Sequence, residues 1–424
     1  MSKERFRNYA RKFEQEAREA TRLNERIDLY RLASIQYYNA GDIYACEVLS
    51  SAASEAVEAG KFDKAFELYI EIGKLSYDLD SDDIFWYLDA WWIAKKLGKT
   101  DELVIEIEKT LKRGIEHASD RLTKENKSDA SLEYANRVYG LAANYHKTTL
   151  DYSGYLVNIE KAIGFLAEKK NIDEKRIADE YSVAGNNVYI THPLKSIELF
   201  NKADSYYNKI YGSTEIKEMN YFMHEDREKA KAIEEIKLPV KIKVHPLLLE
   251  YMFEKKSTDP FSMLSMITED ARDARQSLKY LKFLEAERLN VILAEMHLLL
   301  GNFDESKKCY MRAVECLEYM FYFMDLKPED SSEEIRRIAE YDIIAAKIEY
   351  VMGNMFVVCE HYSDAADNMR LLKDYETALN YYEIALKYAT ITETPRERWD
   401  NMRRETVEGV EEKINEVRVI IEQK

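Results

Sequence analysis

The sequence predicts an all-α fold, in which antiparallel helix pairs stack into an α-solenoid. Turn-forming residues are sparse for its 424 residues, with 13 Gly and 6 Pro, whereas a sheet protein of this length needs many turns. Apolar residues recur at helical spacing along most of the chain. Small and aromatic residues also recur together at several places, which is typical of repeated helix pairs.

The clearest helix pair lies within residues 289–320. One apolar stripe at helical spacing ends at Leu299 and a second begins at Phe303, with Gly301-Asn302 between them. This arrangement predicts two helices joined by a very short turn. Small residues occupy the positions at which the two helices must approach each other closely, namely Ala294, Ser306 and Ala313.

The motif from Gly301 to Ala313, G-x-F-x-x-S-x-x-x-Y-x-x-A, resembles the second helix of a tetratricopeptide repeat. The same spacing recurs at Gly60, Phe62, Ala65 and Tyr69, and again at Tyr375, Ala378, Tyr382 and Ala385. The resemblance implies tandem helix pairs, or a related helical repeat, whose first helices line a concave groove that binds an extended or helical peptide.

Residues 40–75 are also similar to soluble NSF attachment proteins. The segment AGDIYACEVLSSAASEAVEAGKFDKAFELYIEIGKL contains an alanine-rich first helix and a Y-x-x-x-G ending, as the paired helices of those proteins do. This weaker resemblance covers only the N-terminal part of the chain. It implies an alternative role, that of an adaptor for an AAA-type ATPase.

The first helical array is expected over residues 1–212. An amphipathic helix over residues 3–22 either caps the array or acts as a basic docking arm. Gly41 and Gly60 end the helices predicted at 27–40 and 43–59. Further helix pairs are predicted within residues 84–117, 137–166 and 177–207. Trp91 falls where the family usually has a small residue, so the pair at 84–117 is expected to be splayed or offset.

The repeat pattern fails between Gly212 and Pro260, and we expect a connector over residues 213–262. Within it, residues 236–246 read IKLPVKIKVHP, which alternates apolar and lysine side chains and contains two prolines. Such a pattern is typical of an extended chain or an edge strand. The segment is therefore either a linker or a strand that pairs with a partner or with another copy of the chain.

The second helical array is expected over residues 263–424 and ends in a charged helix after Pro395. This last helix has an apolar stripe with spacings of three and four residues: Val407, Val410, Ile414, Val417 and Ile421. The stripe either seals the end of the array or forms a short coiled coil with a second chain. A homodimer through this helix is the consequence of the second interpretation.

The acidic composition argues against two classes of partner. Lys+Arg number 62 against 79 Asp+Glu, a net charge of −17, which repels nucleic acid and anionic lipid. The sequence has no uninterrupted apolar run of about 18 residues, and its N-terminal segment has no apolar signal sequence. The four cysteines form no C-x-x-C pair. We therefore expect no nucleic-acid binding, no membrane insertion, reduced thiols and a cytoplasmic location.

No motif for catalysis or cofactor binding is present. The sequence contains no G-x-G-x-x-G, G-x-x-x-x-G-K, G-x-S-x-G or H-E-x-x-H. None of the seven histidines lies three or four residues from another His or Cys, as metal ligands on a helix would. We therefore expect no enzyme activity, no metal and no cofactor.

The resemblance to tetratricopeptide repeats also implies which residues face the groove. Large aromatic side chains and an arginine occur among them, as at many binding surfaces. The candidate groove residues are Phe85, Leu88, Trp92, Lys95, Tyr134, Arg137, Leu141, Asn144, Tyr181 and Tyr189. The alternative is that these aromatic side chains belong to the core.

The expected function is that of a non-enzymatic adaptor or scaffold, which binds a peptide or a partner protein in this groove. A second hypothesis is a regulator that binds a small peptide and dimerises through its last helix. Both follow from the repeat architecture rather than from any catalytic motif.

Overall fold

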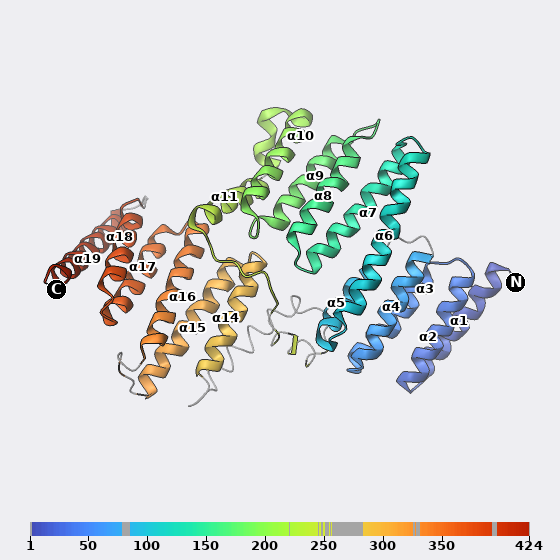
Figure 1. The fold of residues 1–424 in the computed structure, drawn as a ribbon, viewed down its shortest axis with the longest axis horizontal. Coiled ribbons are helices and arrows are strands. Elements are labelled where there is room, and N and C mark those ends of the chain that lie inside the picture. Colours follow the sequence, from blue (N-terminus) through green and yellow to red (C-terminus); the bar gives the residue numbers. More distant parts are fainter. Residues whose placement is uncertain are drawn as a thin grey trace. The chain divides into compact units, whose positions relative to one another are not determined.

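A computed structural model describes residues 2–78, 85–219, 221–244, 246, 249–250, 254, 256, 283–324, 327, 331–391 and 397–423. Over these residues the chain forms 17 helices and no strand (Figure 1). The predicted all-α fold is therefore confirmed for the described part of the chain.

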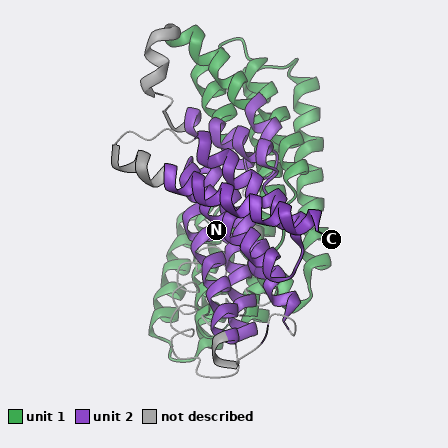
Figure 2. Ribbon diagram, turned by 90° about the vertical axis from the view of Figure 1, so that its left-hand side faces the viewer, with its two compact units in different colours: residues 1–184, 199–219, 243–263 green, residues 185–198, 220–242, 264–424 purple. Residues whose placement is uncertain are grey.

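The chain divides into two compact units, which Figure 2 colours separately. Unit 1 comprises residues 1–184, 199–219 and 243–263, and unit 2 comprises residues 185–198, 220–242 and 264–424. Between residues 185 and 263, around the expected connector, the chain passes from one unit to the other several times. The division into 1–212, 213–262 and 263–424 stays a prediction.

Unit 1 contains an uninterrupted series of helices. These are α1(Lys3–Glu19), α2(Leu23–Asn39), α3(Tyr44–Glu58), α4(Phe62–Asp78), α5(Phe85–Leu97), α6(Thr100–Lys124), α7(Asp129–Thr148) and α8(Tyr152–Ala167). Each of them packs against the next along the chain (Figure 1). Two further helices, α9(Glu174–Val188) and α10(Pro193–Met219), contribute residues to both units.

Unit 2 repeats this arrangement. It contains α11(Tyr221–Ile236), α14(Phe283–Leu299), α15(Phe303–Met324), α16(Ser332–Val351), α17(Met355–Leu371), α18(Tyr375–Ile391) and α19(Glu397–Glu422). Consecutive helices from α14 to α19 pack against each other, and α11 packs against α16. The predicted α-solenoid of antiparallel helix pairs, similar to tetratricopeptide repeats, is therefore confirmed as the fold class.

Glycines in the left-handed region form the short turns within pairs. Gly60, with φ 70°, follows α3, and Gly301, with φ 77°, follows α14. In each turn the next residue donates its N–H to a carbonyl five positions earlier, Lys61 to Ala56 and Asn302 to His297. These bonds satisfy carbonyls at the helix end. The same local chemistry therefore makes the turns of both units.

Small side chains lie where paired helices touch. Ala65, Ser306 and Ala378 are all fully buried. The Ser306 hydroxyl donates to the Ala294 carbonyl at 2.8 Å. The Ser196 hydroxyl donates in the same way to the Gly185 carbonyl at 2.9 Å. The predicted close approach of the helices at these positions is confirmed.

Ion pairs connect helices that lie two apart in the chain. Arg31 on α2 pairs with Glu71 on α4 at 2.9 Å, and Lys202 on α10 pairs with Glu160 on α8 at 3.1 Å. The partners are 40 and 42 residues apart. Because this separation exceeds the period of about 34 residues in tetratricopeptide repeats, the helices here are longer than usual.

The first and last described helices each contribute to a core. Ala10 and Ala17 of α1 are buried in the core of unit 1. Val410, Ile414 and Val417 of α19 are buried in the core formed by α16, α17 and α18. The apolar stripe of α19 thus packs within the same chain, and the role of this helix, as a seal or as a coiled coil with a second chain, stays a prediction.

The segment after α11 forms no strand in its described part, residues 238–244. Lys237 adopts a φ of 51° and ends the helix, and the Leu238 N–H then donates to the Ile233 carbonyl at 3.3 Å. Lys241 pairs with Glu295. Residues 238–244 thus form no strand within this chain, and the linker interpretation stays a prediction. No described helix combines the length and apolarity needed to cross a membrane.

Candidate functional site

The predicted groove begins on α5, where the side chains of Phe85 and Leu88 lie outside the described part of the structure. Trp92 is only 4% exposed and belongs to the core of unit 1. The expectation that Trp92 faces a partner is therefore wrong, because α5 packs against neighbours on more than one side. Lys95, one turn further on, is exposed.

A buried aromatic pair joins α5 to α7. Trp91 packs edge to face against Tyr145, with ring centroids 6.3 Å apart. The Lys95 ammonium lies 5.5 Å from the centroid of Trp91 and 6.0 Å from that of Trp92, which is within cation–π range. The Trp91 ring therefore contacts the exposed Lys95 ammonium and also fills the space between α5 and α7. The sequence marked Trp91 as an exception but did not identify Tyr145 as its partner.

The predicted groove residues of α7 differ from one another in burial, as those of α5 do. Leu141, the counterpart of Trp92, is half-buried and packs against the unit 1 core. Asn144, the counterpart of Lys95, is exposed, and so is Arg137. Lys95 and Asn144, which are equivalent positions on these two helices, are thus both exposed. The exposed row that results consists of Lys95, Arg137 and Asn144, and we call it the polar row.

Tyr134, another predicted groove residue, contacts α6. Its hydroxyl lies 3.1 Å from Nδ1 of His117, and the Arg121 guanidinium lies 4.8 Å from its ring centroid. Its ring also packs against the small cluster around Ala118 and Val138. The side chain therefore serves the α6–α7 contact, and its assignment to the groove stays a prediction.

Tyr181 also has a packing role. Its ring stacks against Tyr206 of α10 with centroids 6.1 Å apart, next to the apolar cluster of Ile163, Leu166 and Ile177. The Lys202 ammonium lies 5.6 Å from the ring centroid of Tyr181. Tyr181 therefore takes part in the contact among α8, α9 and α10, and its place in the groove stays a prediction.

Tyr189 lies in unit 2, whereas the other candidate residues lie in unit 1. It packs edge to face against Phe303, with centroids 6.4 Å apart. A Cβ at Gly301 would come within 2.4 Å of its hydroxyl. Burial, reinforced by the charges of Asp226 and Glu225, raises the pKa of Tyr189 above its ordinary value. The residue fixes the start of α15 and is not part of the polar row.

A polar network that sequence reasoning missed holds α7 beside α9. Glu133 accepts from Lys169 at 2.7 Å and pairs with Arg176 at 2.8 Å. Arg176 also donates to the amide oxygen of Asn136 at 3.1 Å. The hydrogen bond from Arg176 is the main cause that lowers the pKa of the Glu133 carboxyl. The network orients the α7 turn that also carries Arg137.

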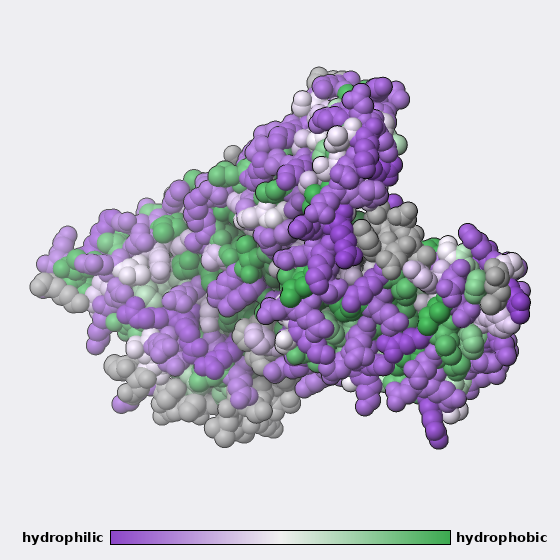
Figure 3. Space-filling view, turned by 45° about the vertical axis from the view of Figure 1, so that its right-hand side comes forward, coloured by the Kyte–Doolittle hydropathy of each residue, from purple (hydrophilic) through white to green (hydrophobic). Residues whose placement is uncertain are grey.

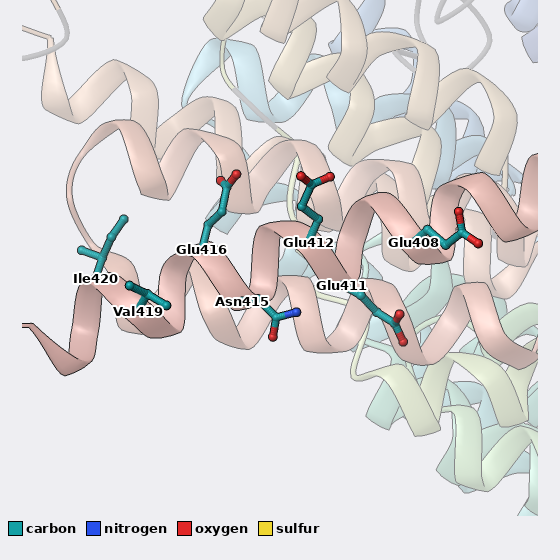
Figure 4. Close-up of a pocket in the computed structure, with 7 residues that line it drawn as sticks. All are labelled: Glu408, Glu411, Glu412, Asn415, Glu416, Val419 and Ile420. Carbon is teal, nitrogen blue, oxygen red and sulfur yellow. The ribbon is translucent and has the colours of Figure 1, made fainter.

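The outer surface of α19 has the opposite character. A hollow of about 780 Å³ is lined by Glu408, Glu411, Glu412, Asn415, Glu416, Val419 and Ile420 (Figure 4). Two cations near this hollow are engaged elsewhere, since Lys413 pairs with Asp367 at 2.6 Å and Arg418 with Glu383 at 2.8 Å. The terminal helix of unit 2 therefore presents an acidic face.

The described residues contain no group of three His, Cys, Asp or Glu side chains able to hold a metal ion. All four cysteines are buried and unbridged, and burial raises the pKa of the Cys309 thiol to about 11. Such a thiol is a poor nucleophile near neutral pH. The expectation of a non-enzymatic protein stays a prediction.

No family model matches the sequence, and no curated protein matches it either. The similarity to soluble NSF attachment proteins thus finds no support in these comparisons.

Among solved structures, the chain is similar to a signal-transduction ATPase with a tetratricopeptide-repeat sensor from Pyrococcus horikoshii, with 16% identity and a TM-score of 0.20 over 77% of this chain. It spans only 45% of that protein. Yeast Tom70 matches over 98% of this chain and 96% of its own, with 15% identity and a TM-score of 0.20.

A circular tandem repeat protein matches over 100% of this chain and 91% of its own, with 11% identity and a TM-score of 0.21. At these TM-scores the likenesses carry no argument about function. The assignment of a helical-repeat fold therefore rests on the helices and contacts of this chain itself.

Proposed function

We propose that this chain is a non-enzymatic interaction scaffold, and that unit 1 binds a protein or peptide partner along α5 and α7. The observation that carries the proposal is the polar row of Lys95, Arg137 and Asn144, which is exposed next to the buried Trp91–Tyr145 pair. Because consecutive first helices present exposed polar side chains at equivalent positions, a partner chain that crosses both helices meets the same kind of contact twice.

The chemistry of the polar row selects a partner segment rich in acceptors. Lysine and arginine side chains only donate hydrogen bonds, and asparagine both donates and accepts. Carboxylate side chains and backbone carbonyls of an extended peptide can accept hydrogen bonds from side chains of these types. The helices are held by the core beneath them, so little conformational entropy is lost when the partner binds.

The test compares full-length variants in affinity purification from the cells in which the protein occurs. Lys95→Glu together with Arg137→Glu should remove the partner, because both exposed cations become anions. The matched control is Lys112→Glu on α6, whose side chain is 77% exposed and pairs only with the neighbouring Glu116 among the described ion pairs. Recovery of the same proteins by the double variant and by the wild type would contradict the proposal.

A further inference from the structure

A second surface of unit 1 is apolar. Leu32, Ile35 and Tyr38 of α2 are 43%, 47% and 37% exposed. They follow one another at every third residue along one side of the helix, while the opposite side is buried in the unit 1 core. No other helix in the described part of the chain exposes three large hydrophobic side chains. The surface shown in Figure 3 is largely hydrophilic, with scattered hydrophobic areas.

Helix α2 has neighbours on its buried side. Helix α2 packs against both α1 and α3, and Arg31 joins it to Glu71 of α4. Each exposed Å² of apolar surface still costs about 25 cal/mol relative to burial, and concentrated apolar exposure marks interaction sites in soluble proteins.

Two acidic side chains extend the apolar side of α2 toward its N-terminus. Asp28 lies four residues before Leu32, and Glu25 lies seven residues before it, so all three share one side of the helix. Both acids are exposed, and neither forms an ion pair within the described residues. The helix dipole favours an acid in the first turn, where Glu25 lies, but its effect does not extend to Asp28.

We propose that this side of α2 binds an amphipathic helix of a partner protein, apolar on one side and rich in Lys and Arg beside it. The apolar residues of such a helix would cover Leu32 and Ile35, and its cations would meet Asp28 and Glu25. A helix fits because side chains on successive turns of α2 form a ridge that packs between those of another helix.

The charge of the whole chain favours a foreign cationic partner over a second copy. The net charge of −17 attracts a basic helix at long range and repels another molecule of the same chain. A second copy would also bring its own Glu25 and Asp28 to the contact. The proposal concerns α2, which carries none of the residues of the polar row, so it does not depend on the proposed binding along α5 and α7.

The experiment measures fluorescence anisotropy of the full chain with a labelled synthetic peptide of about 18 residues, long enough for five helical turns. Leucine occupies every third or fourth position of this peptide and lysine the others. A scrambled peptide of the same composition, with leucines all around the helix, is the peptide control. Binding should be saturable for the amphipathic peptide and about tenfold weaker or more for the scrambled one.

Substitutions in the full chain test whether the peptide binds at α2. Leu32→Glu with Ile35→Glu should weaken binding of the amphipathic peptide by about tenfold or more, and Asp28→Lys by a smaller factor. The matched control is Ile105→Glu on α6, because Ile105 is 50% exposed in the same unit, and it should bind as the wild type does. Lys95→Glu with Arg137→Glu should also bind normally, which separates this proposal from the proposed function. Circular dichroism confirms that every variant is folded.

Three results would overturn the inference. The first is no saturable binding of the amphipathic peptide. The second is equal loss in the α2 and Ile105 variants, or equal affinity for the scrambled peptide, since either result indicates diffuse charge attraction. The third is a wild-type dimer in light scattering that Leu32→Glu with Ile35→Glu converts to a monomer, because then a second copy covers α2.

Discussion

Unit 2 buries charged side chains, whereas unit 1 keeps most of its charges near the surface. Glu287 and Glu349 of unit 2 are each 1% exposed. In unit 1 the comparable contact between first helices, Glu133 with Arg176, involves side chains that are 41% and 39% exposed. Among the described residues of unit 1 the one carboxylate classed as buried is Glu14.

The difference shows two ways of keeping similar helix pairs in register. In unit 2, Glu287 of α14 accepts hydrogen bonds from Tyr341 and from Arg337 of α16, the latter at 3.0 Å. A shift of either helix would leave a buried charge without its partner, which is costly. In unit 1 an equivalent shift would expose the Glu133–Arg176 pair to water at little cost. Register in unit 2 therefore depends more on specific partners.

The largest effect is expected from Arg337→Met, which leaves Glu287 buried without its cation. Unit 2 should lose about 3–5 kcal/mol of stability, measured by hydrogen exchange of peptides from α14 and α16. The control, Arg176→Met in unit 1, should cost less than about 1 kcal/mol because its pair is solvated. Equal losses would contradict the comparison. Replacing Glu287 and Arg337 together by Met should recover most of the loss.

A smaller effect should be common to both units. Ala65→Leu in unit 1 and Ala378→Leu in unit 2 insert a larger side chain at fully buried helix contacts. Each should cost about 1–3 kcal/mol by overpacking, measured from urea unfolding of the full chain. Ala130→Leu, at an exposed position of α7, serves as the control. If Ala65→Leu were neutral, the close approach of α3 and α4 would not be tight.

Ser306→Ala gives unit 2 the residue that unit 1 has at the equivalent position, Ala65. The substitution removes the bond to the Ala294 carbonyl and leaves the close contact in place. The expected cost is about 1 kcal/mol, seen as a lower urea midpoint. Ser51→Ala, at an exposed serine on α3, should change stability by less than about 0.5 kcal/mol. A loss at Ser306 above that of the overpacked variants would be inconsistent with this account.

The smallest expected effect is the pH dependence of stability, which has opposite signs in the two units. Burial raises the pKa of Asp342 in unit 2, so its contribution to stability is present at low pH and is lost as pH rises through the folded-state pKa. Hydrogen bonding to Arg176 lowers the pKa of Glu133 in unit 1, so that contribution is present at neutral pH and is lost on acidification.

Asp342→Asn should therefore stabilise unit 2 slightly at neutral pH and flatten its pH dependence. Other titratable groups face this site, because His361 lies 3.6 Å from Asp342 and burial also raises the pKa of Glu318 and Asp364. The measurement is hydrogen exchange of α16 peptides between about pH 5 and pH 8. An unchanged pH slope in the variant would exclude Asp342 as its source. Glu133→Gln should instead destabilise unit 1 at neutral pH.

Much of the fold could be predicted from local patterns. The turns at Gly60 and Gly301 require a left-handed residue, and the sequence places glycine there. The contact positions Ala65, Ser306 and Ala378 were recognisable because the spacing of small and aromatic residues repeats. These features depend on neighbours within a few turns of helix, so they can be read without knowledge of the tertiary structure.

The candidate site was predicted less well. Periodicity correctly placed Trp92 and Arg137 on first helices, but Trp92 is in the core and Arg137 is exposed. A helix inside an array contacts the helices before and after it, so its buried arc is wider than that of a helix on a simple two-layer protein. Residues at the edge of this arc, such as Tyr134 and Tyr181, are half-buried and contact neighbouring helices, which periodicity alone did not predict.

By itself the sequence determined the helices, their glycine turns and the small residues at which they touch, because those depend on backbone conformation and side-chain size over short distances. Only the tertiary structure decided which charged residues are buried, since Glu287 and Arg337 are 50 residues apart. The tertiary structure likewise decided that Trp91 meets Tyr145 and that Leu32 and Ile35 stay exposed. Burial depends on which distant helices come to lie alongside, and a local pattern does not contain that information.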